Sequence, residues 1–519
     1  MTHPMPPAET LLFRRQFLIV PHSTADAPAG WTHRMVGARH LYAHPDLTVT
    51  AHCTEGRGEL LLLGFAIDPR EPEADDAQIL ASLAGSLGAV AGDDEAFLDE
   101  LDALSGRFLL LVAEEQRLRL FPDASALRRA VFTGRGTDFH AASDTALLRT
   151  VLPLGATDRL RVFTDSRHFR TSEENWLPAD VTLHPEVHRL KANHVLCSES
   201  GEQARFWPRS PLVPLPPAAA ATAIAGTLAA SIAGAHRRFP LVLPLTAGVD
   251  SRTLLAATLS LPRQIDAYTL TYRDLVRSST DVDVPRRLSA ALGFPHRVIP
   301  CRRRPRTAWR RLYLQHSELA HHREDGRIAS GIGRGLGFGR VALNGTVAEA
   351  GRDFYYRDGS PPPTETAADI LALVPGWAEI PFVVDAVESW FAEARPVADR
   401  FGYELSSLFY WEHRTAGWQA QSQLEWDIVF DSFSPFSNRR LLERMLGVDH
   451  RLRLTPGYPL LYDVIRALSD DVLVEPVNRF SRADRMRSFL SRCRRRLLRA
   501  AKARRRARDL VEGAALRAR

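Results

Sequence analysis

The segment Phe239–Arg252, FPLVLPLTAGVDSR, constrains the fold of this 519-residue chain more than any other stretch. An apolar run ends in the small residues Ala247 and Gly248, and a helical pattern follows. This order predicts a strand, a tight turn and a helix. The first N–H groups of a helix have no intrahelical partners, and the helix dipole adds positive charge at the same end. The turn is therefore a candidate anion-binding site.

The side chains of this turn indicate which anion it binds. Thr246 and Ser251 offer hydroxyl donors, but Asp250 is a carboxylate in an anion site. A carboxylate repels a bound phosphate unless a divalent cation lies between them, so we interpret Asp250 as a magnesium ligand. A tight strand-to-helix turn that binds no ligand has the same pattern and stays an alternative.

With these residues in view, Thr246–Arg252 resembles the pyrophosphate-binding loop, S-G-G-x-D-S, of the N-type ATP pyrophosphatases, the superfamily of asparagine synthetase and β-lactam synthetase. The resemblance implies ATP and Mg²⁺ as cofactors. The cofactor-binding residues it implies are Leu245, Thr246, Ala247, Gly248, Val249, Asp250, Ser251, Arg252, Thr271 and Gly345. No G-x-x-x-x-G-K-[ST] motif occurs, so the sequence does not support a P-loop kinase or NTPase.

A second loop, LNGTVAEAGRDFYY at Leu343–Tyr356, resembles the G-x-G-G/S-D/E loop of asparagine-synthetase-like chains. The match implies that Gly345 is the first glycine and that Glu349 helps to hold magnesium. Val347 and Ala348 stand where the family has smaller residues, and losing glycine stiffens a loop, so we expect an altered local geometry. The implied catalytic residues are Asp250, Glu349 and Arg352, with Asp250 and Glu349 as the metal ligands.

Strands and helices alternate after the first loop, which predicts a parallel sheet with ligands at the carboxyl ends of its strands. Asp281 and Asp283 either line that crevice or cap a helix. The alternating glycines of GIGRGLGFG (331–339) predict a close-packed connection into the next strand, since they do not match G-x-G-x-x-G. The expected elements are helices Thr253–Ser260 and Val284–Leu292 and strands Ile265–Thr271 and His296–Pro300.

The N-terminal third is rich in strand patterns, with apolar alternation through Leu47–Cys53 and strands predicted at 59–68, 107–113 and 117–121. With Gly106–Phe108 and Asp123, this order resembles the glutaminase-type domain at the front of asparagine synthetases. That class uses an N-terminal Cys as nucleophile. Thr2 stands at that position here, so we expect no glutamine hydrolysis; a hydroxyl nucleophile at Thr2 is the alternative.

Five prolines between Pro208 and Pro217 predict a stiff linker between two domains. The fold class expected is α/β: an antiparallel sheet sandwich of the glutaminase type, then a parallel-sheet synthetase domain with a helical C-terminal lobe. Within that lobe, Arg414 and Arg439 are candidate anion contacts, and Trp411 and Trp418 are expected in the core. The domain boundaries are 1–207, 208–217 for the linker, 218–478, and 479–519 for an Arg-rich tail.

The net charge of +6 is unevenly distributed, because the tail from Arg479 holds sixteen basic residues against three acidic ones. The tail thus carries +13 and the rest of the chain −7, which gives the body no field for nucleic acid. Met486, Phe489, Leu490, Cys493 and Leu497 form an apolar stripe in a predicted helix. This helix either docks with its cations outward, as we favour, or lies on an anionic membrane or a polynucleotide.

Other features limit the classes of protein. The four cysteines are too scattered for a zinc site or a disulfide framework. No run of 18 apolar residues and no signal-peptide pattern occurs, so a cytoplasmic protein is expected. His316, Glu318, His321 and His322 lack the helical i, i+4 spacing of zinc ligands, which disfavours a metal site there.

The resemblance implies a reaction in which a carboxylate attacks the α-phosphorus of ATP and an amine then attacks the acyl-adenylate. We expect an amide-bond synthetase that forms AMP and pyrophosphate, takes small-molecule or peptide substrates and forms a possible homo-oligomer. In that family a C-terminal lysine steadies the second transition state. No lysine lies between Lys191 and Lys502 in this chain, so either an arginine replaces it, by electrostatics alone, or that step differs. The alternatives are a weakened ATP-binding scaffold subunit and a tRNA-modifying enzyme.

Overall fold

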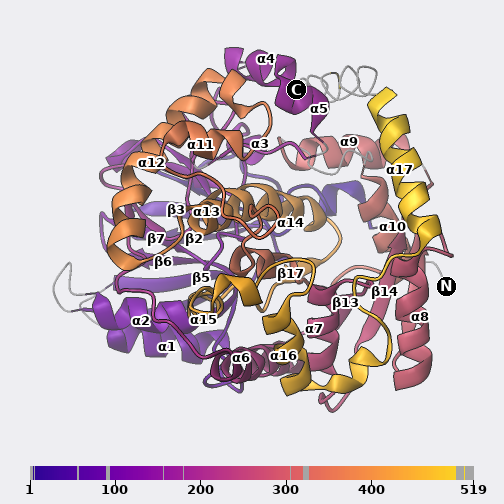
Figure 1. The fold of residues 1–519 in the computed structure, drawn as a ribbon. Helices are drawn as coiled ribbons and strands as arrows, with labels where there is room; N and C mark the ends of the chain where they lie inside the picture. Colours follow the sequence, from indigo (N-terminus) through magenta and orange to yellow (C-terminus); the bar gives the residue numbers. More distant parts are fainter. Residues whose placement is uncertain are drawn as a thin grey trace.

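The structure, a computed structural model, is an α/β arrangement of two antiparallel sheets, one parallel sheet and surrounding helices (Figure 1). It describes residues 4, 6–54, 58–88, 94–155, 157–172, 174–178, 180–303, 305–318, 326–497 and 508. The predictions made for Thr2, His321, His322 and Lys502 lie outside these residues.

The first antiparallel sheet has six strands in the order β10-β8-β9-β1-β3-β2. Its strands are β1 (Phe17–Val20), β2 (Thr32–Val36), β3 (Arg39–Ala43), β8 (Val131–Thr133), β9 (His140–Ala142) and β10 (His188–Arg189). The second sheet has the order β12-β11-β7-β6-β5-β4. Its strands are β4 (Val49–Thr54), β5 (Gly58–Ile67), β6 (Ser105–Ala113), β7 (Leu118–Pro122), β11 (His194–Cys197) and β12 (Glu202–Arg205).

These two sheets pack face to face, which confirms the predicted sandwich. On β5, Leu61 and Leu63 join the core between the sheets, whereas Leu60 and Leu62 face the large core shared with the helices. Because both faces of β5 are buried, its sequence is a continuous apolar run rather than an alternation. The flanking helices are α1 (Asp76–Ser86), α2 (Glu95–Ala103), α3 (Thr145–Leu148), α4 (Asp158–Asp165) and α5 (Arg167–Thr171).

The third sheet is parallel, as predicted, with the order β15-β14-β13-β16-β17. Its strands are β13 (Leu241–Pro244), β14 (Asp266–Thr271), β15 (His296–Pro300), β16 (Val341–Leu343) and β17 (Asp431–Phe433). The strand order reverses at β13, and loops that follow strands at such a point open a crevice at the carboxyl edge.

Helices cover both faces of this sheet. On one face lie α6 (Pro217–Arg238), α7 (Val249–Thr258), α8 (Thr280–Leu292) and α16 (Pro459–Leu468), and on the other α9 (Thr307–His316) and α10 (Arg327–Leu336). Helix α6 has a mean hydropathy of 1.5, enough by length and composition to cross a membrane. Half of it is buried within the fold, where it packs against α16, α7 and α15, as a core helix does.

The C-terminal region is helical around a short strand. Its helices are α11 (Ala367–Ala372), α12 (Pro381–Phe401), α13 (Leu405–Phe409), the π-helix η5 (Tyr410–Gln419), α14 (Ala420–Trp426), α15 (Arg439–Leu446) and α17 (Arg482–Leu497). The 3₁₀ turn η3 (Thr346–Gly351) follows β16, and η7 (Asp470–Val474) follows α16. The sequence pattern hid β17 because its three residues lie between two helical segments.

The structure corrects three further predictions. Helix α7 begins at Val249 instead of Thr253, so the loop ends in the first turn of the helix. Gly331 and Gly335 lie inside α10 rather than in a connection, and an added Cβ would meet Cys301 and Ile299 there. These glycines allow the helix to approach the sheet closely. Helix α17 docks with Met486, Phe489 and Leu490 of the apolar stripe exposed, the reverse of the docking that we expected.

Candidate functional site

The first loop ends in a helix N-terminus that no side chain caps. Gly248 is the N-cap residue of α7, and it makes no side-chain capping bond. Within the described part of the chain, the N–H groups of Val249, Asp250 and Ser251 have no protein acceptor. Such groups, together with the helix dipole, suit an anion such as a phosphate.

The preceding N–H groups of the loop are held by side chains. The Thr246 N–H donates to Ser251 Oγ at 3.2 Å, and the Gly248 N–H donates to Thr246 Oγ1 at 3.1 Å. The Ala247 N–H donates to Asp281 Oδ1 at 3.0 Å, where a carboxylate from the first turn of α8 contacts the loop. Asp281 therefore lines the crevice, the first of the two roles that its position allowed.

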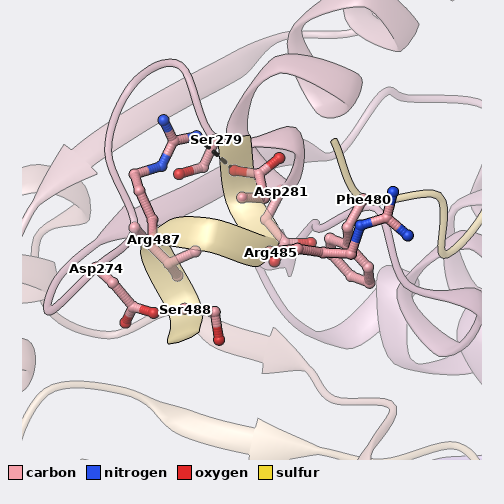
Figure 2. A pocket seen from close by; sticks show the side chains of 9 residues that line it. Asp274, Ser279, Asp281, Phe480, Arg485, Arg487 and Ser488 are labelled. Atoms are coloured by element: carbon pink, nitrogen blue, oxygen red, sulfur yellow. Dashed lines mark hydrogen bonds and ion pairs between the residues drawn. The ribbon is translucent and has the colours of Figure 1, made fainter. Parts of the chain in front are cut away.

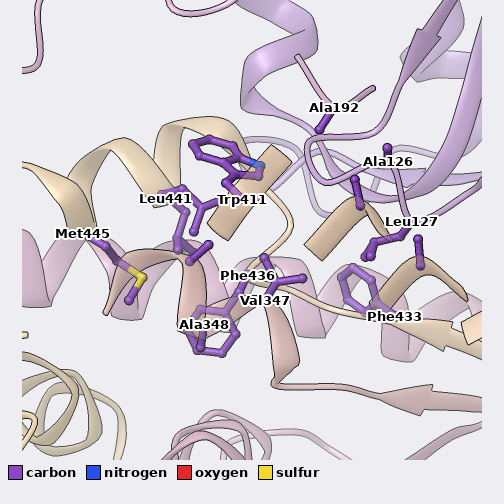
Figure 3. Packing of buried hydrophobic residues seen from close by; sticks show 14 of the residues in the cluster. Ala126, Leu127, Ala192, Val347, Ala348, Trp411, Phe433, Phe436, Leu441 and Met445 are labelled. Carbon is purple, nitrogen blue, oxygen red and sulfur yellow. The ribbon is translucent and has the colours of Figure 1, made fainter. Parts of the chain in front are cut away.

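The second loop lies directly beside the first. A Cβ added at Gly345 would be 2.9 Å from Asp250 Cβ, so only glycine permits this approach. Val347 and Ala348 are fully buried in the 3₁₀ turn η3, among Phe433, Phe436 and Leu441 (Figure 3). Neither residue has a positive φ. The larger side chains thus fill the core, and they impose no strain on the loop backbone.

Asp250 and Glu349 face the same arginine. Arg352 Nη2 lies 3.0 Å from Asp250 Oδ2 and 3.4 Å from Glu349 Oε1. The Tyr410 hydroxyl donates to Glu349 Oε2, and the Arg352 guanidinium lies over the Tyr458 ring, 4.8 Å from its centre. The three catalytic residues predicted from sequence therefore lie together.

Among the residues that the structure describes, Asp250 Oδ1 is buried and finds no hydrogen-bond partner. Burial raises the pKa of Asp250 to about 6, because Arg352 only partly offsets the combined effect of burial and of the neighbouring Glu349. Two carboxylates with one spare buried oxygen are a donor set that suits Mg²⁺. Asp250 and Glu349 therefore fit the metal that the resemblance implies, and the uncapped end of α7 fits a phosphate.

The π-helix η5 brings to the site Tyr410 and Gln419, which sequence reasoning missed, and it also carries Arg414, the candidate anion contact. Tyr410 contacts Glu349, and Gln419 Nε2 donates to the Thr346 carbonyl at 2.8 Å. Arg414 pairs with Glu174 at 2.8 Å. Its guanidinium lies within 6 Å of four aromatic rings, those of Trp176, Phe354, Tyr410 and Trp418. No sequence pattern marks a π-helix, although such segments often occur at functional sites.

Other residues predicted to bind the cofactor are engaged in the fold. Leu245 pairs through its backbone with Tyr268 and Thr269, and the Thr271 carbonyl accepts from the Cys301 N–H at 2.9 Å. The buried Arg252 donates to the carbonyls of Val472 at 2.6 Å and Glu475 at 2.8 Å. These contacts position the strands and η7, so any contact of these residues with a cofactor stays a prediction.

Arg439 does not reach the site, contrary to its interpretation as an anion contact. It is fully buried and donates to Asn193 Oδ1 at 3.0 Å, with Asp102 3.6 Å away. The two tryptophans expected in the core differ. Trp411 is buried there, whereas Trp418 is only partly buried and stacks on Arg414.

A pocket of about 440 Å³ opens beside the first loop, on the side of β14 (Figure 2). Asp281 contacts the loop and also lines this pocket, and the Asn478 N–H donates to the Ala247 carbonyl at 2.9 Å. The C-terminal helix α17 forms the opposite wall. The lining residues are Asp274, Leu275, Ser279, Asp281, Phe480, Asp484, Arg485, Arg487 and Ser488.

The other candidate sites have structural roles. His316 is buried against the Leu424 carbonyl, and Glu318 pairs with His184 at 2.8 Å. In the described part of the chain, no three His, Cys, Asp or Glu side chains are grouped as metal ligands. Asp123 is buried and accepts from the backbone N–H groups of Ser125, Leu127 and Arg128, which fixes the turn after β7.

Comparisons with protein-family models and with curated proteins find no match. Among solved structures, one that matches is glutamine phosphoribosylpyrophosphate amidotransferase from B. subtilis, complexed with ADP and GMP. The matched region covers 57% of this chain and 89% of the amidotransferase chain. The TM-score is 0.25 and the sequence identity 11%. A similarity this low identifies neither the fold family nor the activity, so a functional proposal must come from the site itself.

Proposed function

We propose that this chain is an ATP-dependent amide-bond synthetase, resembling the asparagine synthetase family, that forms AMP and pyrophosphate. The observation that carries this proposal is the buried, unpartnered oxygen of Asp250. Asp250 shares Arg352 with Glu349 and lies in the first turn of α7, beside its uncapped N-terminus, where the strand order of the parallel sheet reverses. A nucleoside triphosphate bound with a metal ion requires an anion site for its phosphates and carboxylates for the metal ion, and both are present here.

Each part of the site has a role in such a reaction. The free N–H groups of α7 and the hydroxyls of Thr246 and Ser251 hold the β- and γ-phosphates, and the pocket beside Asp281 receives the nucleoside. Asp250 and Glu349 would hold Mg²⁺, which would supply neutralisation of the phosphate charge. The substrate carboxylate attacks the α-phosphorus and pyrophosphate leaves; the amine then attacks the acyl carbon and AMP leaves. Arg352 stabilises the negative charge that develops during the first step.

In the described part of the chain, no lysine takes part in the contacts of the site. Lys191 pairs with Glu393 at 2.9 Å and so holds two elements together. Arg414 is a cation on η5 whose guanidinium lies 5.8 Å from the centre of the Tyr410 ring, and Tyr410 contacts Glu349. The negative charge of Glu349 helps to raise the pKa of Arg414. An arginine stays protonated, so Arg414 stabilises charge and does not transfer a proton.

We further propose that the amine comes directly from a substrate and not from glutamine. Thiolate chemistry needs an accessible cysteine beside a base. Three of the four cysteines lie within regular elements, Cys53 in β4, Cys197 in β11 and Cys493 in α17, and Cys301 is buried. Burial raises the pKa of the Cys301 thiol to about 12, which makes it a poor nucleophile.

Exchange of labelled pyrophosphate into ATP, measured with a panel of amino acids and peptide acids, tests the proposal. We expect exchange with at least one acid and its loss in Asp250→Ala. Asp283→Ala is the matched control: this carboxylate is on α8 but pairs with Arg286 and Arg287 at the surface. Tight ATP binding without exchange for any acid would refute the synthetase in favour of an ATP-binding scaffold subunit.

A further inference from the structure

Helix α17 docks on the body through its polar side. Asp484 accepts hydrogen bonds from the Thr280 N–H at 3.1 Å and from its hydroxyl. Arg487 Nη2 pairs with Asp484 at 2.6 Å and donates to the Ser278 carbonyl at 3.4 Å. The contacts of Asp484 cap the first turn of α8, and they fix which side of α17 faces the protein.

The opposite side of α17 exposes a continuous apolar stripe. Met486, Phe489 and Leu490 are 58%, 54% and 57% exposed, and their i, i+3, i+4 spacing places them on one face. Helix α17 lies at the edge of the molecule (Figure 1). A stripe of three large apolar side chains, held outward by a docked polar face, indicates an interaction site.

Charge identifies the partner that fits this stripe. Arg482 is exposed next to it, and the tail from Arg479 carries a net +13. A second copy of the chain would cover the stripe but would bring two strongly cationic tails together. A polynucleotide would neutralise the arginines but would leave the apolar side chains in water. An anionic lipid surface accommodates both features, because apolar side chains enter the headgroup region while arginines contact phosphates.

We propose that α17 binds this protein to anionic lipid surfaces, with Met486, Phe489 and Leu490 inserted and Arg482 at the headgroups. The polar side of α17 stays on the body, so the chain binds as a peripheral protein. This proposal rests on the exposed face of α17 alone and is independent of the proposed function.

Flotation of the full chain with lipid vesicles tests the inference. We expect binding to phosphatidylcholine vesicles that contain about one third phosphatidylglycerol, and much weaker binding to phosphatidylcholine alone or at high salt. The variant M486S/F489S/L490S keeps every cation and the docking residues, and its partition should fall by about tenfold or more. The control variant M35S/V213S removes two apolar side chains that are exposed on other surfaces, 48% and 64%, and should bind as the wild type does.

Three results would overturn the inference. Equal flotation of M486S/F489S/L490S and wild type would show that the stripe does not bind lipid. If RNA copurified with both the wild type and the triple variant, dissociated from both equally at moderate salt, and neither protein bound vesicles, the arginines would be assigned to a polynucleotide. A concentration-dependent dimer that the triple variant abolishes, again without vesicle binding, would assign the stripe to a second copy.

Discussion

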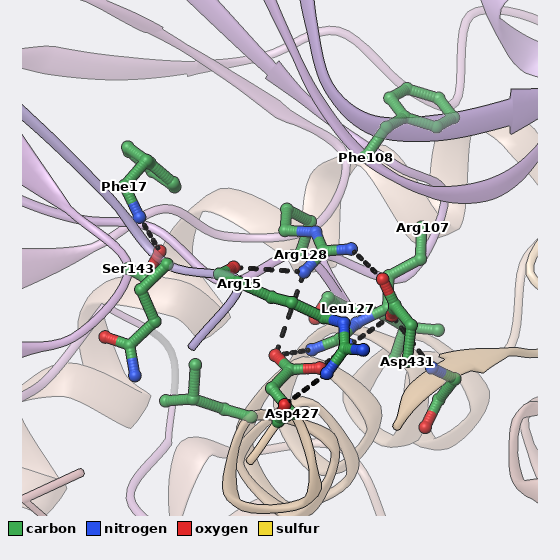
Figure 4. A network of polar contacts seen from close by, with 12 residues as sticks. Arg15, Phe17, Arg107, Phe108, Leu127, Arg128, Ser143, Asp427 and Asp431 are labelled. Carbon is green, nitrogen blue, oxygen red and sulfur yellow. Dashed lines mark hydrogen bonds and ion pairs between the residues drawn. The ribbon is translucent and has the colours of Figure 1, made fainter. Parts of the chain in front are cut away.

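Two clusters of arginines and carboxylates in this molecule have similar chemistry but differ in whether every carboxylate oxygen has a hydrogen-bond partner. At the contact between the sandwich and the parallel-sheet region, Arg107 pairs with both Asp427 and Asp431, at 2.8 Å and 2.7 Å, and Arg128 pairs with Asp431 at 2.8 Å (Figure 4). Every carboxylate oxygen there accepts a hydrogen bond. In the candidate site, one Arg352 nitrogen serves two carboxylates, and Asp250 Oδ1 has no partner.

This difference separates a structural cluster from a binding site. Burial alone would raise the pKa of Asp431, but Arg128 and Arg107 outweigh it and hold that pKa well below its usual value. At Asp250, as at Asp427 in the closed cluster, burial and a neighbouring carboxylate outweigh the arginines and raise the pKa, so the two clusters are separated by the completeness of their hydrogen bonds. A closed cluster is stable as it is, whereas the site gains stability from an additional cation. The predictions below test that distinction, from the largest expected effect to the smallest.

Arg107→Met should lower the free energy of unfolding by about 3 to 5 kcal/mol, because it leaves Asp427 buried without its main counter-ion and removes one of the two arginines that pair with Asp431. Chemical denaturation at neutral pH measures the loss. Arg34→Ala is the control, since Arg34 pairs with Glu59 near the surface and its removal should cost less than about 1 kcal/mol. Equal effects of the two variants would mean that the buried cluster does not hold the two regions together.

A third charged group at the same contact should contribute to the acid stability. Burial would raise the pKa of Glu412, but Arg205, 2.9 Å away, outweighs it and lowers the pKa from 4.5 to about 2. The lowered pKa stabilises the fold fully above pH 4.5, and this stabilisation, about 3 kcal/mol, is lost as the pH falls towards 2. Unfolding midpoints measured across this range should fall steeply for the wild type and less steeply for Glu412→Gln. Parallel curves would contradict the assignment.

Arg352→Met should cost about 2 kcal/mol in the presence of a chelator, because Asp250 and Glu349 then repel each other without a cation between them. Millimolar Mg²⁺ should restore most of this stability by binding the two carboxylates. Denaturation with chelator and with Mg²⁺ measures the difference. The same addition should leave Arg107→Met unchanged, and a rescue of both variants or of neither would remove the distinction between the clusters.

Asp250→Asn should change the free energy of unfolding by less than about 1 kcal/mol, because the carboxylate that it replaces is incompletely paired. The variant should also lose any Mg²⁺-dependent increase in stability that the wild type shows. Thermal unfolding with and without Mg²⁺ measures both effects. A loss as large as that of Arg107→Met would show that Asp250 is a structural residue.

The sequence predicted the parallel sheet and the position of its central strand because β13, β14 and β15 have long apolar patterns next to strong turn signals. It predicted that Asp250, Glu349 and Arg352 lie together only through resemblance, since more than 90 residues separate the two loops. For Asp281 the sequence left two roles open, and only the packing of α8 places it at the Ala247 N–H; the contact of Tyr410 with Glu349 was missed because it depends on the π-helix. The strands of the first sheet were mostly missed because β8, β9 and β10 have only two or three residues each.

The outward stripe on α17 shows the same limit. A helical wheel identifies the apolar face, but only the hydrogen bonds of Asp484 determine which face meets the protein. The pattern favoured burial of the stripe, and three polar contacts to the start of α8 were enough to reverse it.

The arginines of the sandwich have a consequence for its role. Arg107, Arg128 and Arg205 all come from the first 207 residues, and their partners Asp427, Asp431 and Glu412 all come from the second half of the chain. A chain cut at the proline linker would leave three buried carboxylates in its second half without fixed counter-ions. The second half of the chain therefore needs the sandwich for its own stability, whatever chemistry the sandwich itself performs.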